Sequence, residues 1–277
     1  MTTAESRSAE VGNRPAAEPY APKLLCVVNL SPESMVEDSI AHTPDEALAR
    51  ALDLQSHGAS IIDLGGRSIT PDAPQIGDPE EQRRLEPAAR RLRENRIPFS
   101  IDTWSPDTAC AAVDWGADVI NFTGQHASAE MLAAIAGAKA SLILTHMPYG
   151  NAYEMRTRPR LAAPTDAVGA ILESLEPRVA EAHRAGIEDV IIDPNLGIIH
   201  PETDDFEKIH RQLEIVWQAD RLRALGCPLL FYAARKPERL ARIMMASSVL
   251  HARADYIRTH DPSTLRALLR HNAAETS

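Results

Sequence analysis

Cysteine, aromatic residues and long apolar runs are all scarce in this sequence. Its 277 residues include only three cysteines, Cys26, Cys110 and Cys227, and aromatic residues make up 4%. The cysteine spacing fits neither a zinc site nor a redox pair, so we expect reduced core thiols. No apolar run approaches the roughly 18 residues that span a bilayer, and the start of the chain lacks the apolar core of a signal peptide. These absences predict a cytoplasmic protein.

Positive charge is also in the minority, because 29 basic residues face 39 acidic ones. This balance excludes a surface-wide binding site for nucleic acid or for an anionic membrane. It does not exclude a single binding site for an anionic ligand, because the electrostatic potential of one site depends on the charged groups close to it. The HExxH, GxSxG and Walker patterns are absent, which excludes the common zinc-protease, hydrolase-elbow and P-loop sites.

Short apolar segments alternate with helical ones along the chain after a polar beginning. Residues 1–22 are rich in Thr, Ser, Ala, Glu and Pro and predict a disordered tail, so that residues 23–277 form one domain. Strand–helix units repeat at roughly thirty-residue spacing, which favours a (β/α)₈ TIM barrel in the α/β class. A doubly wound open sheet is the alternative, and the lack of a glycine-rich dinucleotide fingerprint argues against it.

The helices of these units have recognisable ends. Thr43 and Glu46 have the spacing of a capping box at the first helix. We expect one continuous helix over about residues 204–225, and a polar loop without a helix over residues 147–164.

Each predicted strand ends at a polar residue, and the carboxyl ends of parallel barrel strands form the usual functional rim. The strand ends are Asn29, Asp63, Asp102, Asn121, Thr145-His146, Asp193, Arg235-Lys236 and Arg258-Thr259-His260. Two carboxylates, an amide and an ammonium suit a flat heterocycle with alternating hydrogen-bond donors and acceptors. We therefore expect a heterocycle site at Asp102, Asn121, Asp193 and Lys236.

A second polar cluster is expected across the barrel mouth. Arg258 and His260 can hold a phosphate, the arginine by paired hydrogen bonds. The side-chain oxygen of Asn29 can ligate Mg²⁺, which usually also takes water and substrate phosphate oxygens. The barrel mouth is thus predicted to bind a phosphorylated heterocycle.

At these residues the sequence resembles the dihydropteroate synthase (pterin-binding) family, from Leu24 to Arg270. Asn29-Leu30-Ser31-Pro32-Glu33-Ser34 resembles the family's Asn-Val-Thr-Pro-Asp-Ser, and the run from Ile61 to Ser68 resembles Ile-Ile-Asp-Ile-Gly-Gly-Glu-Ser. The remaining matches are Ser100-Ile101-Asp102-Thr103, Val119-Ile120-Asn121, His146-Met147, Asp193-Pro194, Arg235-Lys236 and Arg258-Thr259-His260-Asp261. Each motif is weak alone, but their common order and spacing are specific.

The resemblance implies a barrel that joins a 6-hydroxymethyl-dihydropterin diphosphate to the amine of p-aminobenzoate and releases pyrophosphate. By the resemblance, Asp102, Asn121, Asp193 and Lys236 hold the pterin, Asn29 holds Mg²⁺, and Arg258 and His260 hold the diphosphate. Asn29, Arg258 and His260 would then be the catalytic residues, and no protein nucleophile is required. The partners that the resemblance implies are the small-molecule pterin diphosphate and an amine acceptor. Because family members are commonly homodimers, a second copy of the chain is a further possible partner.

The sequence departs from the family pattern mainly on the acceptor side. Ser68-Ile69-Thr70-Pro71 replaces Ser-Thr-Arg-Pro, Tyr232-Ala233-Ala234 replaces Gly-x-Ser before Arg235-Lys236, and Pro237 replaces a serine. Ser68, Thr70, Pro71 and Arg235 thus form an altered acceptor side, and Tyr232 adds a phenol ring beside the pterin slot. The acceptor is therefore p-aminobenzoate or another amine. Two alternatives stay open: a one-carbon transferase that uses a reduced folate, and a catalytically silent pterin-binding paralogue.

Overall fold

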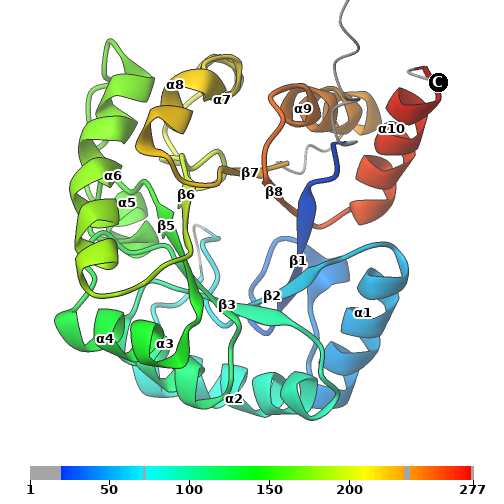
Figure 1. Ribbon diagram of the computed structural model, residues 1–277, viewed down its shortest axis with the longest axis vertical. Helices are drawn as coiled ribbons and strands as arrows, with labels where there is room; N and C mark the ends of the chain where they lie inside the picture. The colour runs from blue at the N-terminus through cyan, green and yellow to red at the C-terminus, as the bar shows by residue number, and fades with distance from the viewer. Residues whose placement is uncertain (1–19, 71–72, 234–237, 276–277) are drawn as a thin grey trace, which may run out of the picture.

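Eight parallel strands form the centre of the molecule in the computed structural model, which describes residues 20–70, 73–233 and 238–275. The strands are hydrogen-bonded in the order β6-β5-β4-β3-β2-β1-β8-β7, and a parallel bridge from Ile192 to Leu229 joins the two edges. The predicted (β/α)₈ TIM barrel is therefore confirmed (Figure 1). The strands are β1 Lys23–Asn29, β2 Ile61–Gly65, β3 Phe99–Thr103, β4 Val119–Phe122, β5 Ser141–Thr145, β6 Val190–Asp193, β7 Leu230–Tyr232 and β8 Tyr256–Thr259.

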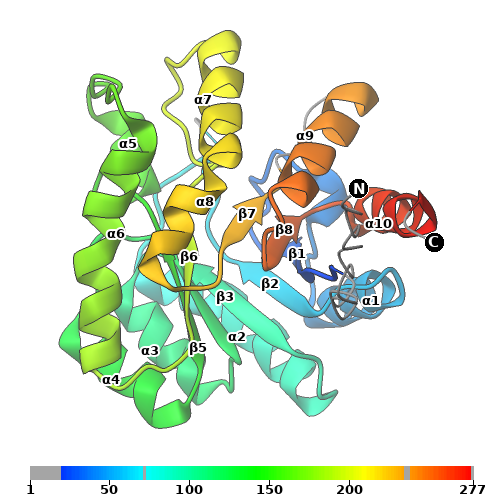
Figure 2. The same cartoon turned by 45° about the horizontal axis from the view of Figure 1, so that its top comes forward.

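Helices surround the strands and cover the outer face of the barrel (Figures 1 and 2). The helices are α1 Pro44–Ser56, α2 Asp78–Glu94, α3 Pro106–Asp114, α4 Ala129–Ala138, α5 Ala152–Thr157, α6 Ala167–Arg184, α7 Asp205–Trp217, α8 Ala219–Leu222, α9 Arg239–His251 and α10 Pro262–Glu275, with 3₁₀ turns at Glu37–Ser39 and Arg223–Leu225. Thr43 caps α1 as predicted, since its side chain accepts a hydrogen bond from the Glu46 amide. No helix within the described ranges is long and apolar enough to cross a membrane.

Two parts of the chain differ from the prediction. The single helix expected over residues 204–225 is interrupted at Gln218, whose backbone leaves the helical region with φ −104° and ψ 22°. The interruption redirects the chain so that Ala219 and Leu222 pack into the core, while Trp217 remains 70% exposed. The expected loop over residues 147–164 contains the short helix α5, which Asn151 caps by accepting from the Glu154 amide. Tertiary burial and a local cap thus override the sequence pattern.

The interior of the barrel is apolar at the amino-terminal end of the strands and polar at their carboxyl end. Leu25, Val119, Ile143, Ile191, Leu230 and Tyr256 form a small buried cluster inside the barrel, separate from the main core under the helices. Side chains two positions apart on a strand point to the same face. The next inward positions are therefore Val27, Asn121, Thr145, Asp193, Tyr232 and Arg258. These positions are polar except for Val27, and we call them the polar cup. They lie above the small apolar cluster, which we call the apolar plug.

Candidate functional site at the carboxyl end of the barrel

Arg258 lies at the centre of the polar cup, between two carboxylates on other strands. Its Nε donates to Asp63 Oδ2 at 2.6 Å, and its Nη2 donates to Asp102 Oδ2 at 2.7 Å. Burial disfavours the charge of Arg258, but attraction to Asp63 and Asp102 outweighs burial and raises its pKa above the usual value. The arginine predicted for the diphosphate is thus also part of a three-strand ion-pair network.

Asn121 lies beside this network on β4. Its Nδ2 is 3.3 Å from Asp63 Oδ2, and Ser100 Oγ donates to Asp63 Oδ1 at 2.6 Å. The amide oxygen of Asn121 is buried and has no hydrogen-bond partner among the described residues. An unpaired buried acceptor costs free energy, about 1–3 kcal/mol in general, and a ligand donor removes this cost. Asn121 Oδ1 is therefore an acceptor poised for a ligand.

Asp102 and Asp193 are recessed carboxylates on either side of Asn121. Burial raises the pKa of Asp193 to about 6 against the opposing hydrogen bond from the Asn195 amide. Burial likewise raises the pKa of Asp102 to about 6, although the attraction of Arg258 lowers it. Both groups are thus held near the point of protonation, as ligand-binding carboxylates in closed sites often are.

Asn29 ends β1, and its orientation is fixed by the following loop. Its Nδ2 donates to Ser39 Oγ at 2.6 Å, and Ser39 Oγ donates to the Val36 carbonyl at 2.6 Å. Because the amide nitrogen is used in this bond, Oδ1 is the atom left to ligate a cation. Among the described residues no cluster of three or more His, Cys, Asp or Glu side chains is arranged to hold a metal. A cation at Asn29 would therefore need water and substrate oxygens as its other ligands.

Tyr232 and His260 occupy the β7–β8 side of the mouth. The Tyr232 hydroxyl lies 3.3 Å from His260 Nδ1, and the two rings meet edge to face with centroids 6.0 Å apart. The guanidinium carbon of Arg258 lies 5.6 Å from the centroid of the Tyr232 ring. The phenol ring thus contacts both residues that were predicted to bind phosphate.

Comparisons with known proteins identify the family of this chain. The family model described as pterin binding enzyme matches residues 25–255. The chain belongs to this family. Dihydropteroate synthase type-3 of Escherichia coli is 28% identical over 263 residues, which cover 90% of this chain and 97% of that protein. Dihydropteroate synthase type-1 of Pseudomonas aeruginosa is 28% identical over 261 residues, 88% of this chain and 90% of that protein. The resemblance found in the sequence motifs is confirmed.

Solved structures of dihydropteroate synthases share the fold. The enzyme from Thermus thermophilus in complex with 4-aminobenzoate has a TM-score of 0.75 at 26% identity, covering 91% of this chain and 94% of that one. The same enzyme in complex with 6HMPPP has a TM-score of 0.73 at 25% identity, covering 92% and 94%. The Thermus thermophilus enzyme thus binds each of these two ligands.

The loop that carries the altered acceptor-side residues is tied to its neighbours. Ser68 Oγ and Thr70 Oγ1 both donate to the Glu33 carbonyl, at 3.2 and 3.0 Å. Arg156 of α5 donates to the carbonyls of Thr70 and Ala73. These bonds hold the β2–α2 loop against the β1 loop and α5. Pro71, Arg235 and Lys236, which the sequence also assigned to the site, lie outside the described residues.

Asp63 is the residue that sequence reasoning undervalued. The sequence pattern marks Asp63 only as a polar strand end, whereas in the structure it is fully buried and accepts hydrogen bonds from Arg258, Ser100 and Asn121. The available signal was strand alternation, because Asp63 follows Ile61 by two positions and Ile61 packs on the interior cluster.

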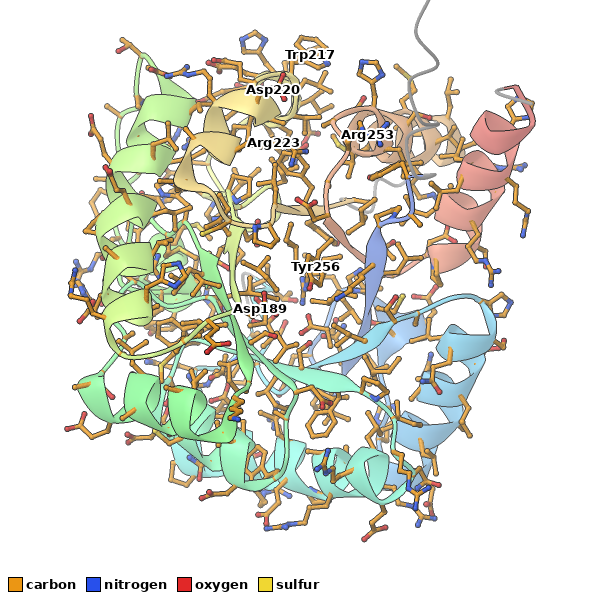
Figure 3. All side chains as sticks on the ribbon, viewed as in Figure 1. Asp189, Trp217, Asp220, Arg223, Arg253 and Tyr256 are labelled. Carbon is orange, nitrogen blue, oxygen red and sulfur yellow. The ribbon has the colours of Figure 1, made fainter. Side chains whose placement is uncertain are left out.

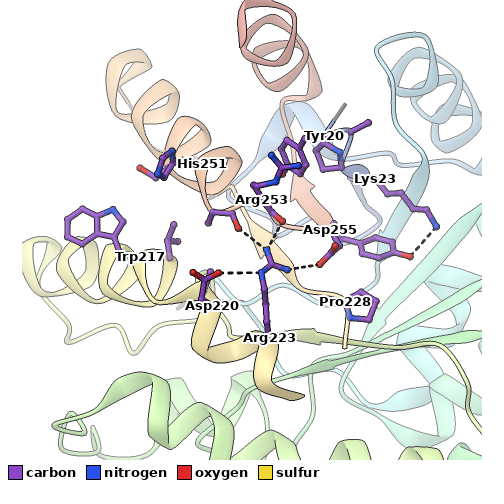
Figure 4. A pocket seen from close by; sticks show the side chains of 16 residues that line it. Tyr20, Lys23, Trp217, Asp220, Arg223, Pro228, His251, Arg253 and Asp255 are labelled. Carbon is purple, nitrogen blue, oxygen red and sulfur yellow. Dashed lines mark hydrogen bonds and ion pairs between the residues drawn. The ribbon is translucent and has the colours of Figure 1, made fainter. Parts of the chain in front are cut away.

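A cavity of about 750 Å³ lies at the other end of the barrel, among the residues drawn in Figure 4. Of these residues, Trp217, Asp220, Arg223, Arg253 and Tyr256 are also labelled in Figure 3. Its charged groups are largely paired with the surrounding chain. Arg223 donates to the carbonyls of Ala252 and Arg253 at 2.9 and 2.7 Å, and Lys23 donates to the Tyr256 hydroxyl at 3.3 Å (Figure 4). Tyr256 begins β8, whereas Arg258 lies two positions nearer the carboxyl end, so this cavity and the polar cup are at opposite ends of the barrel. The carboxyl-end mouth is therefore the candidate active site.

Proposed function

We propose that this protein is a transferase of the dihydropteroate synthase type. It would join a 6-hydroxymethyl-dihydropterin diphosphate to p-aminobenzoate or another amine and release pyrophosphate. The observation that carries the proposal is the buried Oδ1 of Asn121, which has no hydrogen-bond partner in the described part of the chain and lies between the recessed carboxylates Asp102 and Asp193. The structures of the Thermus thermophilus enzyme in complex with 4-aminobenzoate and in complex with 6HMPPP support it.

The proposed pterin site matches the edge of the heterocycle. A pterin presents an N–C–NH₂ edge with adjacent donors, which an ionised carboxylate accepts in a paired manner. Asp193 would take this edge, and Asp102 and Asn121 would take the remaining ring nitrogens. Lys236, by the family resemblance, would donate to the pterin carbonyl. The apolar plug beneath the heterocycle offers no hydrogen-bond partners, so these side chains would have to accept the hydrogen bonds that the pterin donates.

The diphosphate is assigned to the opposite side of the mouth, at Asn29, Arg258 and His260. Asn29 fits a Mg²⁺ ligand, because Ser39 fixes its amide and leaves the oxygen as the donor atom. Mg²⁺, when bound, would neutralise charge on the departing pyrophosphate. Arg258 carries a charge that attraction to Asp63 and Asp102 maintains against burial, and it would attract the diphosphate oxygens.

The reaction proposed for this arrangement is a substitution at the pterin methylene carbon. The carbon–oxygen bond to the diphosphate breaks and its electron pair leaves with pyrophosphate. The lone pair of the amine then forms the new carbon–nitrogen bond, and the amine loses a proton to solvent. The contribution of the protein is to orient both substrates and to stabilise the leaving charge.

The acceptor side has fewer charged groups than the family pattern provides. Thr70 stands where the family has arginine, and its hydroxyl is used in the bond to the Glu33 carbonyl. The acceptor would therefore be held mainly by loop shape and by Ser68, Thr70, Pro71 and Arg235. This is why the proposal includes amines other than p-aminobenzoate.

A homodimer is the proposed assembly. Large apolar side chains are exposed on two neighbouring helices, with Phe206 at 89% and Trp217 at 70% on α7, and Leu240 at 68% and Met244 at 62% on α9. Such a concentration of exposed apolar side chains is typical of a protein interface. The cytoplasmic location, the domain division at residue 22 and the absence of nucleic-acid and membrane partners remain predictions.

The decisive experiment is a titration with 6-hydroxymethyl-dihydropterin diphosphate and Mg²⁺, followed by p-aminobenzoate, with pyrophosphate release as the readout. Turnover with p-aminobenzoate or a panel of aryl amines supports the proposal. Binding of a methyl- or methylene-tetrahydrofolate without pyrophosphate release would instead identify a one-carbon transferase. Pterin binding without product under every amine would identify a silent paralogue.

Two variants connect the titration to the site. Lys236→Ala and Asn121→Ala should each weaken pterin binding, the second about 5- to 150-fold, because one hydrogen bond in a closed site is lost. Asp189→Asn is the matched control, since Asp189 pairs with Ser141 at the amino-terminal end of the barrel. Unchanged pterin affinity in Asn121→Ala would remove this amide from the proposed site.

A further inference from the structure

The Tyr232 ring is held in place from three directions. Arg258 is its direct cross-strand partner between β7 and β8, and the Arg258 guanidinium lies beside the ring. The His260 ring meets it edge to face. On the third side Gly197 allows the contact, because a Cβ atom at this glycine would lie 2.8 Å from Tyr232 Cδ1. The position of the phenol is therefore determined by packing and not by the hydroxyl alone.

The hydroxyl of this fixed ring meets one particular nitrogen of His260. A phenol donates readily, and a neutral imidazole has one accepting and one donating nitrogen. If the Tyr232 hydroxyl donates to Nδ1, the ring proton of His260 lies on Nε2. A histidine with its proton on Nε2 can donate to an anionic oxygen from that atom.

We propose that Tyr232 is a positioning residue that fixes the Nε2–H form and the orientation of His260 for binding the diphosphate. The inference rests on the proposed function for the identity of the anion, but the Tyr232–His260 pair itself does not depend on it. It also gives the departure from the family pattern at this position a chemical role. The phenol, in place of a glycine, adds a hydrogen bond behind the anion-binding histidine.

Nitrogen NMR of the histidine rings tests the tautomer without any ligand. The His260 signals are assigned by their loss in His260→Gln. The wild-type ring should carry its proton on Nε2 in the spectrum of the neutral imidazole, and Tyr232→Phe should shift it toward a mixture of tautomers. An Nδ1–H form in the wild type, or the same tautomer in Tyr232→Phe, would overturn the proposal.

Calorimetry with inorganic pyrophosphate and Mg²⁺ tests the consequence for anion binding. Tyr232→Phe should weaken pyrophosphate binding about tenfold, and the double variant with His260→Gln should be no weaker than His260→Gln alone, because the two residues act together. Tyr256→Phe is the matched control, since this phenol contacts Lys23 at the opposite end of the barrel. Additive effects of the two substitutions would contradict the proposal.

Gly197→Ala supplies an independent test, because it keeps the hydroxyl but displaces the ring. It should weaken pyrophosphate binding and alter the His260 tautomer as Tyr232→Phe does. Wild-type values for both would overturn the inferred ring position. Neither readout requires a pterin, so a protein that fails to bind pterin diphosphate would refute the proposed function while the role of Tyr232 is still decided.

Discussion

Arg258 Nε lies 2.6 Å from Asp63 Oδ2, although 195 positions separate the two residues in the chain. The bond joins β8 to β2 across the interior, and the Asp63 side chain is fully buried. The same guanidinium reaches Asp102 on β3. The network therefore ties together the strands that surround the candidate site and also shapes it.

Removing the positive charge of Arg258 should destabilise the fold strongly. Arg258→Met leaves Asp63 and Asp102 without their counter-charge, and the loss of one partner of a buried pair costs about 3–5 kcal/mol in general. Urea unfolding at pH 7.5 measures the free energy of unfolding. Adding Asp63→Asn to this variant should recover part of the loss, because the more deeply buried of the two uncompensated carboxylates is then neutral.

The control for this experiment is an exposed ion pair. Arg83 and Glu80 lie on one face of α2, and the Arg83 side chain is 71% exposed. Arg83→Ala should change the free energy of unfolding little, because solvent screens such pairs. Equal losses in Arg83→Ala and Arg258→Met would contradict the assigned importance of the buried network.

Asp193 should lower the stability of the ligand-free protein at high pH. Its pKa is raised by burial from 3.8 to about 6, so between these values the folded state binds more protons than the unfolded state. Stability from this group is therefore present at low pH and is lost as the pH rises through about 6. Asp193→Asn should stabilise the ligand-free protein at pH 8, on the order of 2 kcal/mol, and much less at pH 4.5.

The measurement is urea unfolding of wild type and Asp193→Asn at both pH values. The amide retains an oxygen for the Asn195 amide, so the loop should keep its conformation. A variant that is less stable than wild type at pH 8 would show that burial of the ionised Asp193 carboxylate does not destabilise the ligand-free protein.

Pterin affinity should fall in acid for the same reason. Asp193 must be ionised to accept the N–C–NH₂ edge, and burial raises its pKa to about 6. With a single group of this pKa the ionised fraction, and with it the affinity, falls about tenfold between pH 7 and pH 5. Fluorescence titration over this range measures the pterin affinity. An affinity that does not change with pH would contradict the assignment of the Asp193 carboxylate to the pterin.

The exposed apolar side chains of α7 and α9 should mediate self-association. Trp217→Arg combined with Leu240→Glu should convert a dimer into a monomer in sedimentation velocity, because charges replace the apolar contact. Leu161→Glu changes another exposed apolar side chain, 53% exposed, in the α5–α6 loop and should leave the sedimentation coefficient unchanged. A monomeric wild-type protein at all concentrations would refute the proposed homodimer.

Sequence patterns were sufficient for the architecture because each strand is a short apolar run that ends in a polar residue. This local information also located Asn29, Asp102, Asn121, Asp193 and Arg258 at strand ends. It did not reveal the break at Gln218, because the residues on either side have ordinary helical character and the interruption depends on where Leu222 can be buried. Nor did it reveal α5 within a polar loop, since the helix is short and depends on the Asn151 cap.

The sequence by itself determined the number of strands, the apolar and polar ends of the barrel, and the family. These properties depend on hydrophobic periodicity and on motifs whose order is read along the chain. Only the tertiary structure decided which polar residues pair: that Arg258 binds Asp63 and Asp102, that Asn121 Oδ1 is left unpaired among the described residues, and that Tyr232 meets His260. The physical reason is that barrel closure and strand register bring distant positions together, and no local pattern encodes that register.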